Sequence, residues 1–409
     1  MRPLLEESFR AAVAAADPLR ILAAHLPSPP AGRTFVAAAG KAAASMALAV
    51  EKDFAGELEG IAITRYEHGL PAKRIRVVEA GHPVPDERGE AAAHEILEQV
   101  KSLGEQDLLL ALLSGGGSSL LSLPAPDVPM EDLKSVTREL LRSGAAIQEM
   151  NTVRKHLSAI HGGRLAAASK APVLALIISD VTGDDPTHIA SGPCAPDPTT
   201  YADALAILHQ YRIKAPRSVQ QRLERGRDET PKPGDPVFAR VENKVIATAH
   251  RSLEAAAEVF RRNGITPVIL GDTVTGEASE VAKAYAALVC EIRRYGTPWK
   301  PPVALISGGE CTVTIRGEGG RGGRCTEFLL SLGIETGSVW AIACDTDGID
   351  GTELNAGAVL SPTSMKRGRD ARLLLAKHDS YGFFSALGEL VTTGPTRTNV
   401  NDYRAILVV

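Results

Sequence analysis

Short runs of aliphatic residues recur along the chain and end in glycine, serine or aspartate. They cover residues 34–40, 107–117, 172–180, 245–250, 302–310 and 338–348. Continuous apolar runs of this length are typical of parallel strands that are buried on both faces of a sheet. Amphipathic helical patterns lie between the runs, for example over residues 88–104 and 250–264. The alternation of strand and helix predicts an α/β fold.

A change in composition suggests where the chain divides. Residues 212–236 are charged, contain several prolines and lack a strand pattern, and the apolar runs resume after them. A chain of 409 residues is long enough for two or three domains of ordinary size. We therefore expect two α/β domains, residues 1–235 and 236–409, which face a cleft.

Composition excludes several classes of protein. The chain has 45 basic and 49 acidic residues, a balance that argues against a dedicated nucleic-acid binder. Its five cysteines are scattered, which indicates neither a disulfide framework nor a zinc ribbon. The apolar runs are too short to cross a membrane, and the acidic N-terminus does not resemble a signal peptide. We expect a cytoplasmic protein with no nucleic-acid or membrane partner, and a homodimer is compatible with the sequence.

The first loop with candidate chemistry follows the run at 34–40 and contains Gly40 and Lys41. It is not a Walker A loop, because Phe35 and Ala42 stand where that motif needs Gly and Ser or Thr. A lysine beside a helix start still offers an anion a positive charge and free backbone N–H groups. A solvated lysine after a tight turn is an equally good interpretation.

The second loop is rich in glycine and serine and joins a strand to a predicted helix. Leu120 breaks both the dinucleotide-binding fingerprint and the nucleophile-elbow pattern. Backbone N–H groups and hydroxyls in such a turn suit phosphate, so we favour a phosphate site over a turn without function. The loop residues are Ser114, Gly115, Gly116, Gly117, Ser118 and Ser119.

Two further loops carry acidic residues where strands end. One contains Asp180, Asp184 and Asp185, and the other contains Asp345, Asp347 and Asp350. Carboxylates in such positions can hold hydrated Mg²⁺ or accept a proton from a substrate, although aspartate is also an ordinary turn residue. The loop that begins at Asp345 is not an EF-hand, because the twelfth position counted from Asp345 is Ala356 instead of Glu.

A last loop, within residues 308–330, spaces Arg316, Arg321 and Arg324 with glycines. Because the planar guanidinium group matches carboxylate and phosphate oxygens, we favour an anionic-substrate site over a solvated loop. Histidines add little, and His82, His156 and His188 are interpreted as hydrogen-bonded structural or rim residues. Glycine loops, clustered cations and strand-end acids together match phosphoryl transfer.

The motifs together resemble those of the glycerate 2-kinases that end in a MOFRL domain, which combine DUF4147 and MOFRL domains and were earlier labelled hydroxypyruvate reductases. The resemblance covers essentially the whole chain. One departure is that Cys325 and Thr326 follow Arg324, where the family usually has Asn and Gln. The matching stretches are GKAA (40–43), EAGHPVPDERG (79–89), SGGGSSLL (114–121), EMNTVRKHLSAIHGGRLA (149–166), SDVTGDD (179–185), IASGPCAPDPTT (189–200), SGGE (307–310), DTDGIDG (345–351) and TGPTRTNVND (393–402).

This resemblance implies ATP-dependent phosphorylation of D-glycerate at its 2-hydroxyl, with Mg²⁺. It also implies a Rossmann-like three-layer N-terminal domain and a C-terminal α/β domain whose MOFRL region spans about residues 300–405. Lys41 and Arg324 match the catalytic basic pair of the family, and we add Asp180 as a third catalytic residue. The remaining assignments are residues 114–119, Glu310 and Asp347 for the nucleotide, Arg154, Lys155 and Arg321 for the substrate, and Asp184 and Asp345 for the metal.

Two other functions remain open. A nicotinamide-dependent hydroxypyruvate reductase would need a dinucleotide fingerprint with an acidic residue about twenty positions later, and neither glycine loop provides one. A nucleotide-binding protein without catalytic activity would need no motif beyond the loops described above, so the sequence does not exclude it. Turnover of glycerate separates the three hypotheses.

Overall fold

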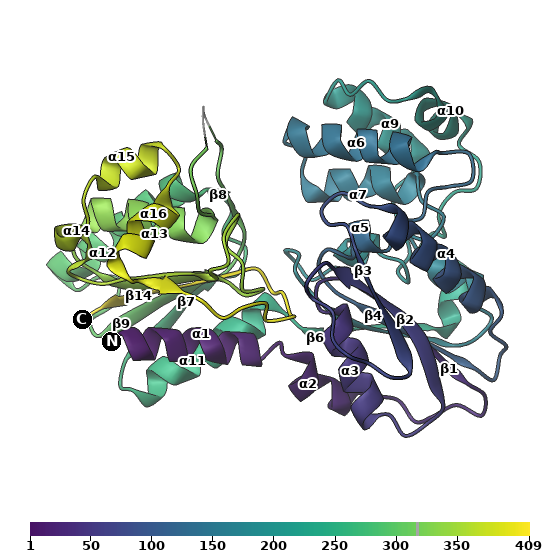
Figure 1. The fold of residues 1–409 in the computed structure, drawn as a ribbon, viewed down its shortest axis with the longest axis horizontal. Coiled ribbons are helices and arrows are strands. Elements are labelled where there is room, and N and C mark those ends of the chain that lie inside the picture. The colour runs from purple at the N-terminus through teal and green to yellow at the C-terminus, as the bar shows by residue number, and fades with distance from the viewer. Residues whose placement is uncertain (316–318) are drawn as a thin grey trace. The chain divides into compact units, whose positions relative to one another are not determined.

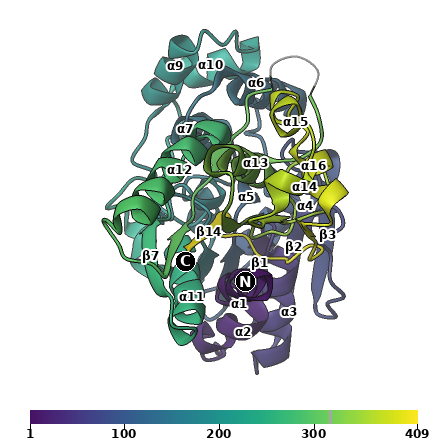
Figure 2. The ribbon, with the colours of Figure 1, turned by 90° about the vertical axis from the view of Figure 1, so that its left-hand side faces the viewer.

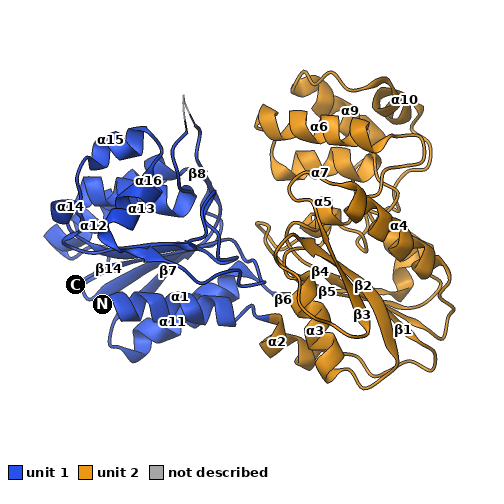
Figure 3. Ribbon diagram, viewed as in Figure 1, with its two compact units in different colours: residues 1–17, 247–409 blue, residues 18–246 orange. Residues whose placement is uncertain are grey.

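The chain folds into two compact units (Figure 3). The computed structural model describes residues 1–315 and 319–409. We call residues 18–246 the parallel-sheet unit, and residues 1–17 with 247–409 the mixed-sheet unit. The chain crosses between the units twice, because its first residues belong with the C-terminal half.

Helix α1 (Arg2–Ala14) joins the mixed-sheet unit through its apolar face. Leu5 and Phe9 are buried in one cluster with Leu253 and Phe260 of α11 (Ala249–Arg262). The amphipathic pattern of a helix predicts a buried face but not which part of the chain buries it. From its sequence alone, helix α1 could not be separated from the domain expected over residues 1–235.

The parallel-sheet unit contains a six-stranded sheet in the order β3-β2-β1-β4-β5-β6 (Figure 1). This is the strand order of the Rossmann fold, and the pairs from β3 to β5 are parallel, as the apolar runs predicted. Every residue of β1, β4 and β5 is buried, so both faces of the sheet are covered. The strands are β1 (Thr34–Ala39), β2 (Leu58–Arg65), β3 (Ile75–Ala80), β4 (Leu108–Leu113), β5 (Val173–Ile178) and β6 (Val241–Ala247).

Helices cover this sheet, and a separate helical cluster lies beyond the carboxyl ends of its strands (Figure 1). Residues of α4 and α8 share one apolar core with β1, β2, β4 and β5. Asp86 caps α4 by accepting a hydrogen bond from the N–H of Gly89 at 3.0 Å. The sheet helices are α2 (Pro18–Ile21), α3 (Ala43–Asp53), α4 (Glu87–Lys101), α5 (Gly117–Leu120) and α8 (Arg164–Ala168), with 3₁₀ turns at Leu22–His25, Ile189–Ser191 and Pro236–Arg240.

The helical cluster absorbs the segment that the sequence suggested as an interdomain connection. Residues 217–225 form α10, whose Val219 and Leu223 are buried against Leu133 of α6 and Leu208 of α9. The charge and proline content of this segment reflects its exposed face and its ends. The members of the cluster are α6 (Met130–Ser143), α7 (Ile147–His156), α9 (Tyr201–Gln210) and α10 (Arg217–Arg225).

The mixed-sheet unit contains a second six-stranded sheet, in the order β13-β12-β11-β14-β9-β7. Strands β7 and β9 pair in parallel, and the other neighbouring strands of this sheet pair antiparallel, so the expectation of parallel strands was wrong here. Its central strands read as continuous apolar runs because both faces are covered by helices, whatever the strand direction. The strands are β7 (Thr266–Gly271), β9 (Val303–Ser307), β11 (Trp340–Asp345), β12 (Gly357–Leu360), β13 (Leu390–Val391) and β14 (Asp402–Val408), and β8 (Gly276–Glu277) pairs with β10 (Cys311–Thr312).

Helices α1 and α11 cover one face of this second sheet, and α12 and α13 cover the other (Figures 1 and 2). Each unit therefore has a β-sheet with helices packed against it, as the predicted α/β fold requires. No helix in the described part of the chain is both long and apolar enough to span a bilayer. The remaining helices are α12 (Ala278–Tyr295), α13 (Arg324–Thr336), α14 (Ser364–Arg367), α15 (Ala371–Ala376) and α16 (Ser380–Leu387).

Candidate active site

Two of the predicted loops meet at the carboxyl ends of β1 and β4, which are neighbours in the parallel sheet. The backbone N–H of Lys41 donates to the carbonyl oxygen of Gly115 at 2.8 Å. The N–H of Ala42 donates to Oγ of Ser114 at 3.1 Å. These bonds fix the lysine loop against the glycine-rich loop, so the two features form one site.

Glycines allow the loop to approach its surroundings closely. Gly116 has φ +80°, and a Cβ there would lie 3.0 Å from the ring of His82 and 3.4 Å from Cγ of Lys41. A Cβ on Gly117 would lie 2.5 Å from Cβ of Ala190, closer than two carbon atoms can pack. The stem of Lys41 and the ring of His82 therefore flank Gly116. A side chain at Gly116 would displace them, and a side chain at Gly117 would displace Ala190.

A backbone segment under strain supports the other side of the loop. Ala190 and Ser191 have φ +50° and +57°, a left-handed conformation that costs residues with a Cβ about 1–3 kcal/mol each. Ser191 Oγ lies 2.7 Å from Oγ of Ser118 and 3.1 Å from Oδ1 of Asn151. Sequence reasoning missed Asn151 and Ser191, because the only signal was their place in the motifs that resemble the family.

The loop serines line a pocket together with Arg154 of α7. Ser118, Ser119, Ser122 and His161 are among its other walls. Arg154 donates from Nη1 to Oδ1 of Asn151 at 3.3 Å, and burial lowers its pKa to about 10. The structure thus brings the predicted substrate residue Arg154 next to the predicted phosphate loop.

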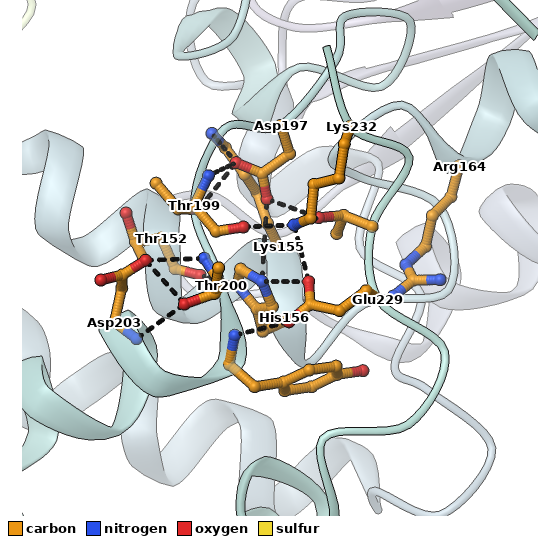
Figure 4. A network of polar contacts seen from close by, with 12 residues as sticks. Thr152, Lys155, His156, Arg164, Asp197, Thr199, Thr200, Asp203, Glu229 and Lys232 are labelled. Carbon is orange, nitrogen blue, oxygen red and sulfur yellow. Dashed lines mark hydrogen bonds and ion pairs between the residues drawn. The ribbon is translucent and has the colours of Figure 1, made fainter. Parts of the chain in front are cut away.

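Lys155, predicted beside Arg154 as a second substrate residue, has a different environment. It is fully buried, and its Nζ lies 3.2 Å from Oδ1 of Asp197 (Figure 4). Burial alone would raise the pKa of Asp197, but Lys155 and hydrogen bonds from Thr199 lower it overall. Neighbouring positions on a helix face different directions, so Lys155 neutralises a buried carboxylate while Arg154 faces the pocket.

The same network continues around His156 (Figure 4). His156 is buried, its Nδ1 lies 2.8 Å from the carbonyl oxygen of Thr152, and its Nε2 lies 3.4 Å from Oε2 of Glu229. Burial lowers the pKa of His156. Lys232 completes the network at 2.6 Å from Oε2 of Glu229. These contacts support the interpretation of His156 as a structural residue.

The acids after β5 lie in a turn of the parallel-sheet unit. Asp180 and Asp184 are partly exposed, and Asp184 has φ +55°. Asp185 accepts a hydrogen bond from the N–H of Thr187 at 2.9 Å, which is the contact of an ordinary Asx turn. Among the described residues, no group of three or more His, Cys, Asp or Glu side chains could hold a metal ion. The catalytic role of Asp180 and the metal role of Asp184 stay predictions.

In the mixed-sheet unit, Arg324 is the first residue of α13 and is surrounded by carboxylates. Its Nε donates to Asp402 at 2.7 Å, its Nη2 donates to Asp345 at 2.6 Å, and its Nη1 lies 3.2 Å from Glu310. Burial alone would lower the pKa of Arg324, but these three acids raise it well above the usual value. We call Arg324, Glu310, Asp345 and Asp402 the Arg324 cluster.

Asp402 was not singled out from the sequence, although it is the most buried acid of the cluster. It begins β14 and also accepts a hydrogen bond from Nη2 of the buried Arg404 at 2.5 Å. Its partners Arg324 and Arg404 lie on α13 and β14, so only the fold brings the three together. Glu310 and Asp345 both contact Arg324, and their roles with the nucleotide and the metal stay predictions.

The loop that holds Asp347 and Asp350 positions the start of α13. The carboxylate of Asp350 accepts hydrogen bonds from the N–H groups of Cys325 and Thr326 at 2.9 and 2.8 Å. The hydroxyl of Thr326 donates to the same carboxylate at 2.7 Å. Asp347 accepts from the N–H of Ile349 at 2.9 Å. Thr326, which departs from the usual family residue, thus takes part in a helix cap.

The other arginines of the glycine-rich tract are placed differently. Arg321 is exposed, stacks 5.0 Å above the ring of Tyr381, and lies 3.9 Å from Asp379. Arg316 lies outside the described residues. A role for Arg321 in substrate binding stays a prediction.

Comparison with known proteins identifies the family. Residues 4–224 match a domain of unknown function, DUF4147, and residues 303–402 match the MOFRL family. A glycerate 2-kinase from Pyrococcus horikoshii is 44% identical over 90% of this chain and 86% of that protein. The chain belongs to the glycerate 2-kinase family. In structure, the glycerate kinase of Thermotoga maritima has a TM-score of 0.88 and 37% identity, covering 100% of this chain and 99% of that one.

Another relative carries a different name. A protein from Agrobacterium vitis that is 50% identical over 100% of this chain and 94% of its own length is provisionally named a hydroxypyruvate reductase. The family resemblance and the α/β fold predicted from the sequence are confirmed. In this family member, Lys41 and its loop belong to the parallel-sheet unit, and the Arg324 cluster belongs to the mixed-sheet unit. That they converge on one substrate stays a prediction.

Proposed function

We propose that this chain transfers the γ-phosphoryl group of ATP to the 2-hydroxyl of D-glycerate, giving 2-phospho-D-glycerate and ADP. The observation that carries the proposal is the joined Lys41 and glycine-rich loops at the carboxyl ends of β1 and β4, in a chain whose relatives are named glycerate kinases. Ligands of Rossmann-like sheets bind beyond these strand ends. Free N–H groups and a lysine there suit a phosphate chain.

The residues would divide the work of phosphoryl transfer as follows. Lys41 neutralises charge on a transferred phosphate oxygen, and Arg324 stabilises the charge that builds up as the bond to ADP breaks. The oxygen of the glycerate 2-hydroxyl forms the new bond to phosphorus, and Asp180 accepts the proton that this hydroxyl loses. Residues 114–119, Glu310 and Asp347 position the nucleotide, and Arg321 contacts the substrate.

Mg²⁺ fits the acids that are present. Asp345 and Asp402 place carboxylate oxygens on two sides of Arg324, and Asp184 is a second candidate ligand. One or two carboxylates together with phosphate oxygens are a common ligand set for Mg²⁺. The ion would neutralise charge on the phosphates when bound. We propose that the enzyme acts in the cytoplasm, and a homodimer would be compatible with the activity.

A reductase is the alternative suggested by the names of the Agrobacterium relatives. Paired assays separate the two functions. The purified protein is given D-glycerate, ATP and Mg²⁺ while ADP release is followed, and hydroxypyruvate with NADH while absorbance at the NADH band is followed. We expect ADP release and no NADH oxidation. NADH oxidation without ADP release from glycerate would overturn the proposal.

A further inference from the structure

Arg154 is half-buried in the wall of this pocket and has no acidic partner in the described part of the chain. Its side chain makes one hydrogen bond, to the neutral amide of Asn151, and no ion pair with a carboxylate in the described part of the chain. Arg222, a buried arginine of the same unit, shows the usual arrangement. It contacts Asp127 at 2.6 Å, the carbonyl oxygen of His156 at 2.9 Å and the hydroxyl of Tyr201 at 3.1 Å. A half-buried guanidinium group without an acidic partner can take an anion from solution, so the pocket suits an anion that comes from outside the chain.

The other walls of the pocket are neutral, with the apolar Pro85 and Leu133 beside several polar side chains. His161 is 2% exposed, and its Nε2 has no hydrogen-bond partner among the described residues. Burial lowers the pKa of His161 to about 3, so the ring is neutral at physiological pH. Hydroxyl groups of Ser118, Ser119 and Ser122 complete the polar lining. The pocket therefore offers one positive charge together with several groups that can bind hydroxyls.

The charge of the pocket fits a small acid. A single guanidinium group matches one carboxylate in charge and geometry, whereas a triphosphate carries several negative charges. The loop that supplies Ser118 and Ser119 also meets Lys41 at Gly116. An acid in the pocket would thus lie on the same loop as the proposed phosphate site.

We propose that Arg154 binds the carboxylate of D-glycerate in this pocket, and that His161 and the loop serines bind its hydroxyl groups. This assignment rests on the proposed function and specifies how the acid is recognised. Selectivity for an acid over the corresponding aldehyde or alcohol follows, because only the carboxylate can pair with the guanidinium group of Arg154.

Arg154→Gln tests the proposal, with Arg222→Gln as the matched control. Losing a charged hydrogen-bond pair should raise KM for D-glycerate at least about tenfold, with KM for ATP unchanged. The melting temperature without ligand should not fall, because the variant loses a charge that had no partner. Arg222→Gln should lower the melting temperature and keep both KM values. Arg154→Lys, which keeps the charge but not the planar fork, should give an intermediate KM for D-glycerate.

Thermal shifts keep this test separate from the test of catalysis. D-glycerate should raise the melting temperature of the unaltered protein and not that of Arg154→Gln, while ATP should stabilise both. An equal shift of both proteins by D-glycerate, or none in either, would overturn the assignment. So would a loss of ATP binding with glycerate binding intact, which would make the pocket a phosphate site. If the protein releases ADP with glycerate while Arg154→Gln keeps an unaltered KM, the proposed function stands and this inference fails.

Discussion

Lys41 and Arg324 carry the same charge in different surroundings. Arg324 is held by three carboxylates, so removing it would take this counter-ion from the buried Asp345 and leave Asp402 with Arg404 alone, at a cost of about 3–5 kcal/mol. The sequence suggested two exposed loop cations whose loss would little affect folding. The structure shows that this expectation does not hold for Arg324, because two of its partners come from distant strands.

Lys41 offers the cleaner test of the phosphate loop. Lys41→Ala should lower kcat by about 10³-fold, by analogy with other cations that stabilise phosphoryl transfer. The melting temperature should stay close to that of the unaltered protein, since Lys41 is partly exposed. Lys101→Ala, which removes an exposed helical lysine paired with Glu98, is the matched control and should keep full kcat. Near-normal kcat in folded Lys41→Ala would remove this lysine from the active site.

His161 predicts how stability depends on pH. Its pKa of about 3 in the folded chain lies below the value of about 6.5 in an unfolded one, so acid protonates the unfolded chain first. Stability is therefore full above pH 6.5 and falls as the pH drops toward 3. Between pH 7.5 and 5.0 this histidine alone should account for a loss of about 2 kcal/mol. Burial lowers the pKa of His156 and His188 in the same direction.

Urea denaturation at the two pH values measures this dependence. His161→Gln should lose about 2 kcal/mol less than the unaltered protein between pH 7.5 and 5.0. His94→Gln, which replaces an exposed histidine of α4, is the control and should not change the difference. A pH dependence that is the same in His161→Gln and the unaltered protein would contradict the buried, neutral state of His161.

Among the elements, strands were predictable in position but only partly in direction. The apolar runs at 34–40 and 338–348 became β1 and β11 with ends within two or three residues. Strand β11 pairs antiparallel with both neighbours, which its sequence does not reveal because burial on both faces produces the same run in either direction. The different roles of the neighbours Arg154 and Lys155 could not be predicted either, because Asp197, the partner of Lys155, lies 42 residues away in the sequence.

The glycine-rich loop is the element whose sequence specifies its packing most directly. Gly117→Ala would press a methyl group against Ala190 and should cost about 1–3 kcal/mol of stability. Because the displaced segment carries Ser191 beside Ser118, KM for D-glycerate should rise as well. Gly104→Ala is the control, as the nearest atom to its Cβ would be 3.8 Å away. Equal urea midpoints and KM values in the two variants would show that the loop tolerates a side chain.

At the scale of the whole molecule, the sequence indicated two α/β parts but not how the chain divides between them. Helix α1 is separated from its partner α11 by more than two hundred residues, and the intervening parallel-sheet unit folds around its own core. The predicted catalytic residues are shared between the two units, with Lys41 and Asp180 in one and Arg324 in the other.

Phosphorus NMR of the reaction products tests this account most directly. The protein is incubated with D-glycerate, ATP and Mg²⁺, and the spectrum is compared with standards of 2- and 3-phosphoglycerate. We expect ADP and 2-phospho-D-glycerate to appear in equal amounts, and both to form about 10³-fold more slowly with Lys41→Ala. A spectrum that shows only 3-phosphoglycerate, or ATP that stays intact while the folded protein is saturated with both substrates, would contradict the proposed reaction.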